Sequence, residues 1–197
     1  MKAELEVKFL NIDSEDMRAR LERAGAMLEQ PMRLMRRVVI EQPEHKIEHA
    51  FLRVRDEGDK TTLTFKRRRT PHPTKIDDVK EIEVVVSDFD ATVEIFKEAG
   101  WDYLTYQETK RETWKLDDVE VVIDRWPWLA PSIEIEGPSE ASVRASAEKL
   151  GLAWSDAFYG QIDDVYALQY TFKPGIRGII DVPNARLDDP LPEQFQG

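Results

Sequence analysis

Charged and apolar residues alternate in the segment that runs from Glu4 to Leu10. Because successive side chains of a β-strand point to opposite faces, Glu4, Glu6 and Lys8 would share one face of such a strand. The opposite face would be apolar. The segment therefore predicts a strand with one charged and one apolar surface, and the fold must provide an environment for both.

The same alternation recurs in later segments, where it gathers like charges on one face. The residues that share a face in this way are Arg53 with Arg55, Lys66 with Arg68, Glu81 with Glu83 and Glu134 with Glu136, while Asp124 stands at the end of another strand. Faces that only meet water usually mix many polar residue types. Here the faces separate into carboxylate pairs and basic pairs.

The periodicity along the chain predicts an α+β fold. Strands are expected at residues 4–10, 34–41, 50–55, 61–68, 80–86, 112–116, 120–124 and 133–136, and helices at 13–27, 88–99 and 139–150. Residues 69–79 are expected to form a loop. Neighbouring strands joined by short turns favour antiparallel pairing. Residues 1–172 are expected to form one domain and residues 173–197, which are rich in proline, an irregular tail.

An ordinary half-exposed sheet would also present charged faces to water. However, the predicted helices carry apolar stripes that need a surface to pack against, and the apolar strand faces supply it. With helices on the outside, the charged faces must line an interior. A closed antiparallel β-barrel satisfies this and removes the sheet edges. Since unpaired buried charges are costly, the interior is expected to be a solvated tunnel.

The composition excludes several classes of protein and partner. The chain has 197 residues and a formal net charge of −11, and this negative charge disfavours binding to the nucleic acid backbone. It has no cysteine, which excludes disulfides and thiol chemistry. No segment is long and apolar enough for a membrane span or a signal peptide. We expect a cytoplasmic protein, monomeric or homodimeric, without a nucleic acid or membrane partner.

The two kinds of charged side chain point to a common ligand. Carboxylates are the oxygen ligands that Mg²⁺ and Mn²⁺ prefer, and Mg²⁺ is often shared with substrate phosphates. Arginine and lysine match phosphate oxygens. Both kinds of group in one cavity therefore predict a polyphosphate bound together with Mg²⁺ or Mn²⁺.

The order of these charged groups resembles that of the CYTH domain proteins, also known as triphosphate tunnel metalloenzymes. The resemblance covers roughly residues 1–170 and rests on the E-x-E-x-K motif Glu4-Leu5-Glu6-Val7-Lys8, followed by Leu52-Arg53-Val54-Arg55, Leu63-Thr64-Phe65-Lys66, Glu81-Ile82-Glu83-Val84, Lys110-Arg111-Glu112-Thr113-Trp114, Val122-Ile123-Asp124 and Ile133-Glu134-Ile135-Glu136-Gly137. E-x-E-x-K alone is a weak signal, but this order of pairs is specific. The resemblance implies an eight-stranded antiparallel tunnel that binds a triphosphate with divalent cations.

The resemblance also implies roles for individual residues. Metal ligands would be Glu4, Glu6, Glu83, Asp124, Glu134 and Glu136, and phosphate-binding residues would be Lys8, Arg53, Arg55, Lys66, Arg68, Lys110 and Arg111. Glu4, Glu6 and Lys8 are the candidates for direct participation in catalysis.

The chain departs from this family's pattern in two places. Thr109 stands where many relatives have a lysine in a K-x-R arrangement, and the adjacent Lys110 is the expected substitute. The segment Trp128-Leu129-Ala130-Pro131 replaces the usual Leu-Gly before the last strand.

Three functions are compatible with these residues. The first is a divalent-metal-dependent hydrolase that releases the terminal phosphate of tripolyphosphate, thiamine triphosphate or a nucleotide. The second is a class IV adenylyl cyclase that makes cyclic AMP and pyrophosphate from ATP. Cyclases of this class often have a His-Phe pair before E-x-E-x-K, and only Lys2-Ala3 stands directly before Glu4 here, which favours hydrolysis. The third is a non-catalytic polyphosphate- or nucleotide-binding module.

Overall fold

The computed structural model describes residues 2–47, 49–69 and 79–197, and only the backbone of residues 2–4, 46 and 47 is considered. Most of the loop expected at residues 69–79 therefore lies outside the described residues. The strands are β1 (Lys2–Glu4), β2 (Glu6–Phe9), β3 (Met27–Ile40), β4 (Ala50–Asp56), β5 (Thr61–Arg68), β6 (Val79–Val86), β7 (Thr105–Leu116), β8 (Val119–Arg125), β9 (Ser132–Glu136) and β10 (Asn184–Ala185). The helices are α1 (Ser14–Arg23), α2 (Pro43–Ile47), α3 (Phe89–Glu98), α4 (Glu140–Lys149) and α5 (Ile162–Gln169), with 3₁₀ turns η1 (Trp154–Asp156), η2 (Ile179–Asp181) and η3 (Glu193–Phe195).

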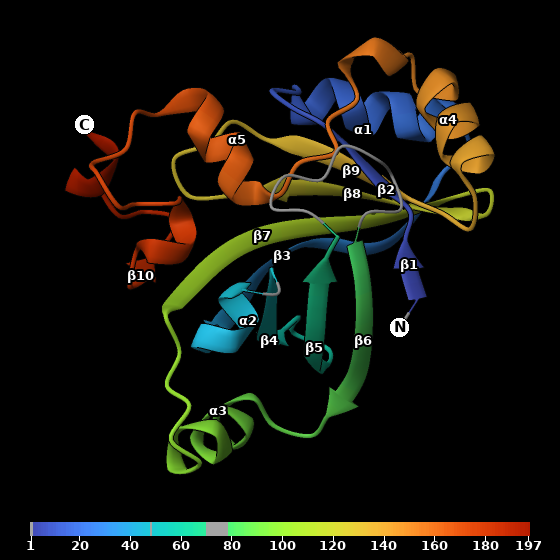
Figure 1. Cartoon of the computed structure of the whole chain (residues 1–197). Coiled ribbons are helices and arrows are strands. Elements are labelled where there is room, and N and C mark those ends of the chain that lie inside the picture. Colours follow the sequence, from blue (N-terminus) through green and yellow to red (C-terminus); the bar gives the residue numbers. More distant parts are fainter. Residues whose placement is uncertain (1, 48, 70–78) are drawn as a thin grey trace.

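All of these strands belong to one sheet, in the order β1-β6-β5-β4-β3-β7-β8-β9-β2, with β10 paired to β7 beside this path. The pairings along the path are antiparallel, and β10 runs parallel to β7. The sheet curls so that β2, β8 and β9 form an upper layer and β4, β5 and β6 a lower one (Figure 1). The predicted α+β fold on an antiparallel sheet, with the eight strands β2 to β9, is confirmed.

The sheet is an open half-barrel rather than the closed barrel that we expected. Its two ends are β1 and β2, which follow one another along the chain with Leu5 between them. Residues 2–4 pair with β6 and residues 6–9 pair with β9. The first half of the N-terminal segment therefore pairs at one edge of the sheet and the second half at the other. The two edges are connected through the backbone at Leu5, without a continuous ladder of hydrogen bonds.

Two helices pack against the outer face of the upper layer, as their apolar stripes predicted. Figure 1 shows α1 and α4 above β2, β8 and β9. The core between these helices and the sheet contains Met17 and Leu21 of α1 and Val143 and Ala147 of α4, packed against residues of the outer strand face such as Ile135. Helix α3 covers the lower layer, where Phe89 and Val93 contact Val38 and Val54. The apolar strand faces are therefore on the outside of the curl, and the charged faces are on the inside.

The remaining differences from the expected elements concern their lengths and the C-terminal half. Strand β3 begins at Met27 instead of Leu34, and its register with β7 shifts on either side of Gln30, next to Pro31. A proline lacks the N–H that a regular ladder of hydrogen bonds needs, so the sequence pattern did not predict the part of β3 that precedes Leu34. Helices α2 and α5 were not predicted. No helix among the described residues is long and apolar enough to cross a membrane.

Candidate active site

The concave face of the sheet encloses a cavity of about 460 Å³. Every strand from β2 to β9 contributes side chains to its wall, and α5 and η2 contribute others. The predicted site residues that line it are Glu6, Lys8, Arg53, Arg55, Lys66, Arg68, Glu83, Arg111, Asp124, Glu134 and Glu136. The alternation along the strands thus brings together charged groups that are more than a hundred residues apart in sequence.

Two predicted site residues do not line the described wall of this cavity. Glu4 belongs to β1, and its side chain lies outside the described residues. Lys110 pairs with Leu34 and Arg125 on the opposite face of β7 from Arg111, because neighbouring residues in a strand face opposite sides. The structure therefore corrects the expectation that Lys110 replaces a lysine at position 109.

Lys8 joins two of the carboxylates that we expected to bind metal. Its Nζ lies 2.5 Å from Oε1 of Glu6 and 3.2 Å from Oε2 of Glu134. Burial alone would raise the pKa of Glu134, but the charges of Lys8, Arg111 and Lys66 outweigh it and hold that pKa well below its ordinary value. Glu134 is therefore ionised throughout the physiological pH range.

Arg111 holds the carboxylate at the end of β8. Its Nε and Nη2 donate to the two oxygens of Asp124 at 2.7 and 2.6 Å, and Nη2 lies 3.6 Å from Glu134. Burial opposes the charge on Arg111, but Asp124 and Glu134 raise its pKa well above the ordinary value. This fork-to-carboxylate geometry fixes the guanidinium in one orientation.

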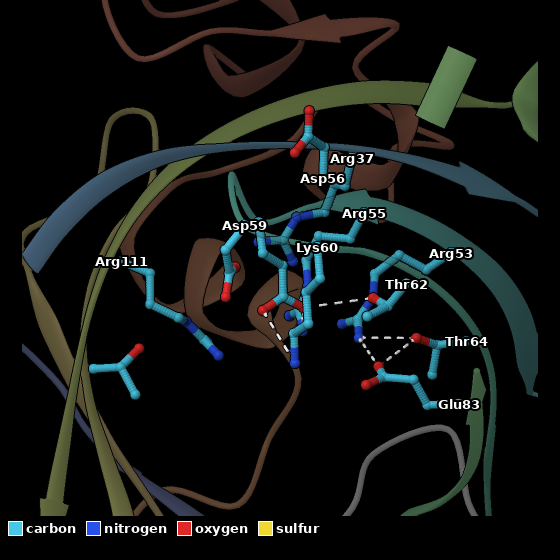
Figure 2. Close-up of polar contacts among 12 residues, drawn as sticks. Arg37, Arg53, Arg55, Asp56, Asp59, Lys60, Thr62, Thr64, Glu83 and Arg111 are labelled. Carbon is cyan, nitrogen blue, oxygen red and sulfur yellow. Dashed lines mark hydrogen bonds and ion pairs between the residues drawn. The ribbon is translucent and has the colours of Figure 1, made fainter. Parts of the chain in front are cut away.

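The lower layer of the curl presents a second set of cations (Figure 2). Nη2 of Arg53 donates to Thr64 Oγ1 at 3.2 Å and lies 3.5 Å from Glu83. Lys66 lies 3.2 Å from Glu81. Arg55 donates from Nε at 2.9 Å and from Nη2 at 2.5 Å to Oε1 of Glu57. These pairs keep the cations extended into the cavity.

The carboxylates of the upper layer have the donor chemistry that a divalent cation needs. Glu6 and Glu136 are register partners on β2 and β9, and Glu136 is also the partner of Glu120 on β8. Side chains at such paired positions start about 5 Å apart, so their oxygens can converge on one ion. Among the described residues, no three acidic or histidine side chains are already arranged around a common point. The Lys8 ammonium group lies between Glu6 and Glu134, and its contacts with both hold these two carboxylates apart.

Several residues of the cavity were missed in the sequence. Arg33 and Arg37 of β3, Glu57 and Glu120 all line it. The two arginines lie four residues apart and hence on one face of a strand, but the run Arg33-Leu34-Met35-Arg36-Arg37 does not alternate and gave no signal. The wall formed by α5 and η2 was missed because these elements were not predicted.

Part of the cavity wall comes from the C-terminal part of the chain. Gln161, Ile162, Asp163 and Val165 of the α5 region and Ile180 of η2 contribute to the wall. The Asp163 carboxylate accepts a hydrogen bond from the Ile180 N–H at 3.1 Å, which ties α5 to η2. Burial raises the pKa of Asp163 to about 6, although this hydrogen bond and the charge of Arg68 act in the opposite direction.

We expect Asp163→Asn to stabilise the protein at neutral pH. The folded protein binds a proton at Asp163 up to pH 6, whereas the unfolded chain loses it near pH 4, so stability falls as the pH rises through this window. At pH 7.5 the gain in unfolding free energy should reach at most about 3 kcal/mol, and it should vanish towards pH 4. Urea unfolding at both pH values measures this. Asp188→Asn, an exposed change in the tail, should show no such pH dependence, and an equal gain by Asp163→Asn at every pH would contradict the assignment.

The sequence of charged groups and this geometry agree with one known family. Residues 2–157 match the CYTH domain. The chain belongs to the CYTH domain family. The match ends at residue 157, so α5 and the residues after it lie beyond the matched region. No curated protein matches the chain.

Solved structures share the fold of this CYTH domain. The PH1012 protein from Pyrococcus horikoshii is 25% identical with a TM-score of 0.65, over 78% of this chain and 93% of that one. A candidate adenylate cyclase from Vibrio parahaemolyticus is 9% identical with a TM-score of 0.69, over 84% of this chain and 98% of that one. HpAC1 from Hippeastrum, a candidate adenylyl cyclase with a dominant triphosphatase activity, is 13% identical with a TM-score of 0.57, over 87% and 98% of the two chains.

Proposed function

We propose that this CYTH domain protein is a divalent-metal-dependent triphosphatase that hydrolyses inorganic tripolyphosphate or an organic triphosphate. The observation that carries the proposal is the composition of the cavity wall, in which carboxylates of β2, β8 and β9 face cations of β4, β5 and β7. A ligand that satisfies both sides must carry several negative charges and bring cations of its own. A triphosphate with bound Mg²⁺ or Mn²⁺ has these properties.

The cations of the wall would bind and orient the phosphate chain. Lys8, Arg53, Arg55, Lys66, Arg68 and Arg111 are the phosphate-binding residues of the proposal. Because Asp124 and Glu57 already hold Arg111 and Arg55 in place, little side-chain entropy remains to be lost when a phosphate binds. The reaction forms a bond between a water oxygen and the terminal phosphorus and breaks the bond to the bridging oxygen, which leaves with its electron pair on the diphosphate.

Glu4, Glu6, Glu134 and Glu136 are the residues that would hold the metal, with Glu83 and Asp124 supporting them. All of these except Glu4 line the described wall of the cavity. When bound, Mg²⁺ or Mn²⁺ would neutralise charge on the phosphate oxygens and activate water. No nucleophilic side chain is required, because catalysis of this kind rests on positioning and on charge neutralisation.

A single assay tests the proposal. The protein is incubated with tripolyphosphate and, separately, with ATP, each with Mg²⁺ or Mn²⁺, and phosphate, pyrophosphate and cyclic AMP are resolved. We expect orthophosphate from tripolyphosphate and loss of its release when EDTA removes the metal. Cyclic AMP and pyrophosphate from ATP would instead make the protein a class IV adenylyl cyclase. Binding of tripolyphosphate without turnover of either compound would make it a binding module.

Other expectations from the sequence stay predictions. These are a cytoplasmic location, a monomer or homodimer in solution, the absence of a nucleic acid partner, and a division into a domain of residues 1–172 and a tail of residues 173–197. Light scattering during gel filtration measures the oligomeric state.

A further inference from the structure

The guanidinium of Arg37 occupies an unusual environment inside the tunnel. Arg37 lies on β3, is only 6% exposed and lines the cavity. Its Nη2 donates to Thr109 Oγ1 at 2.9 Å, and its Cζ lies 4.4 Å from the centre of the Trp126 ring. Its Nε has no hydrogen-bond partner within the described part of the chain. The side chain is thus held by one hydroxyl and one aromatic face.

No carboxylate among the described residues forms an ion pair with Arg37. Burial lowers the pKa of Arg37 well below its ordinary value, and the charges of Arg53, Arg55 and Arg111 act in the same direction, against that of Asp124. Figure 2 shows Arg37, Arg53, Arg55 and Arg111 together around the same space. An arginine stays charged under all ordinary conditions, and a buried charge without a counter-ion destabilises the folded state. Packing alone therefore does not account for an arginine at this position.

We infer that Arg37 is a phosphate-binding residue of the tunnel, supplied by a strand that carries none of the charged motif residues. This rests on the proposed function, since the anion that Arg37 binds is the triphosphate itself. The stacked Trp126 ring and the Thr109 hydroxyl fix the guanidinium at the cavity wall. The bond to Thr109 is the only hydrogen bond that this guanidinium makes within the described part of the chain, so a phosphate oxygen would supply the acceptor and the counter-charge that it lacks.

The inference explains the departure at position 109. The sequence lacks the lysine that the resemblance leads one to expect there, and Lys110 faces the other side of β7. The hydroxyl of Thr109 instead accepts a hydrogen bond from Arg37. The positive charge of this part of the tunnel comes from the neighbouring strand, and the short side chain at position 109 leaves room for it.

The test compares Arg37→Met with Arg36→Met. Arg36 is the next residue of the same strand, but it lies on the outer face, where it pairs with Asp56 and Asp90. Both variants lose one positive charge from β3. The probe is imidotriphosphate, the non-hydrolysable analogue of tripolyphosphate, titrated calorimetrically in the presence of Mg²⁺, with thermal unfolding of the ligand-free proteins in parallel.

We expect Arg37→Met to weaken imidotriphosphate binding by about 10- to 100-fold, the usual effect of losing a charged hydrogen bond. The ligand-free variant should unfold at the same or a higher temperature, because a buried charge without a counter-ion is gone. Arg36→Met should change the affinity by less than about twofold. Adding Thr109→Lys to Arg37→Met should restore part of the affinity, since it returns a cation to the same place.

Two results would overturn the inference. One is an unchanged affinity in Arg37→Met. The other is a weaker affinity in a variant that also unfolds at a clearly lower temperature and is not improved by Thr109→Lys, which would make Arg37 a packing residue. Failure of the unmodified protein to bind imidotriphosphate is a separate result, because it would contradict the proposed function itself.

Discussion

Glu136→Gln is expected to reduce the release of phosphate from tripolyphosphate by about 100- to 1000-fold, the range typical for the loss of one group from a preorganised electrostatic site. Glu136 is the register partner of both Glu6 and Glu120, so it stands in the middle of the acidic row of the upper layer. Glutamine keeps the volume and one oxygen but loses the negative charge. Initial rates at saturating Mg²⁺ measure the effect.

Two controls make this result interpretable. Glu148→Gln removes the same charge from the exposed face of α4 and should leave the rate unchanged. Circular dichroism should show that Glu136→Gln is folded, because neighbouring strands do not depend on this carboxylate for their ladder. Full activity of the folded Glu136→Gln protein would show that the acidic row is not part of the catalytic machinery.

The largest effect on stability is expected from Arg111→Met. This change leaves Asp124, which is 4% exposed, without the fork that holds both of its oxygens. Removing one partner from a buried ion pair costs about 3–5 kcal/mol. Glu134 keeps its contact with Lys8, so the loss should come mainly from Asp124. Urea unfolding at pH 7.5 measures it.

The double variant Arg111→Met, Asp124→Asn isolates the contribution of the Arg111–Asp124 ion pair to the free energy of unfolding. It should be more stable than Arg111→Met alone, because no unpaired carboxylate remains at this position. If the losses of unfolding free energy in Arg111→Met and in Asp124→Asn simply add in the double variant, the two residues are not energetically coupled. Their ion pair would then not explain the stability of the upper layer.

The alternation in the sequence was sufficient to predict which faces of the strands are charged and that they line an interior. In particular, Lys8 and Glu134 share a face with their expected neighbours and meet at 3.2 Å. That result depends only on the period of a strand and on the need of the helices for an apolar surface.

The sequence did not predict the features that depend on pairing between distant strands. The role of Arg37 follows from its position opposite Gln107 and Arg55, which is a matter of register and not of local pattern. The open edge at Leu5 has the same origin, since nothing in a strand's own residues tells which partner it takes on each side. Helix α5 was missed because its apolar residue Tyr166 packs on the C-terminal turns, against Ile179 and Phe195.

The division of the N-terminal segment between β6 and β9 has a consequence for how the protein is made. Strands β1 and β2 find their partners far downstream in the chain, at residues 79–81 and 133–136, so they stay unpaired until those strands have been made. Contacts so distant in sequence are slow to form. We therefore expect completion of the tunnel to be a late step in folding, and a bulky fusion placed directly before Lys2 to slow it more than one placed after residue 197.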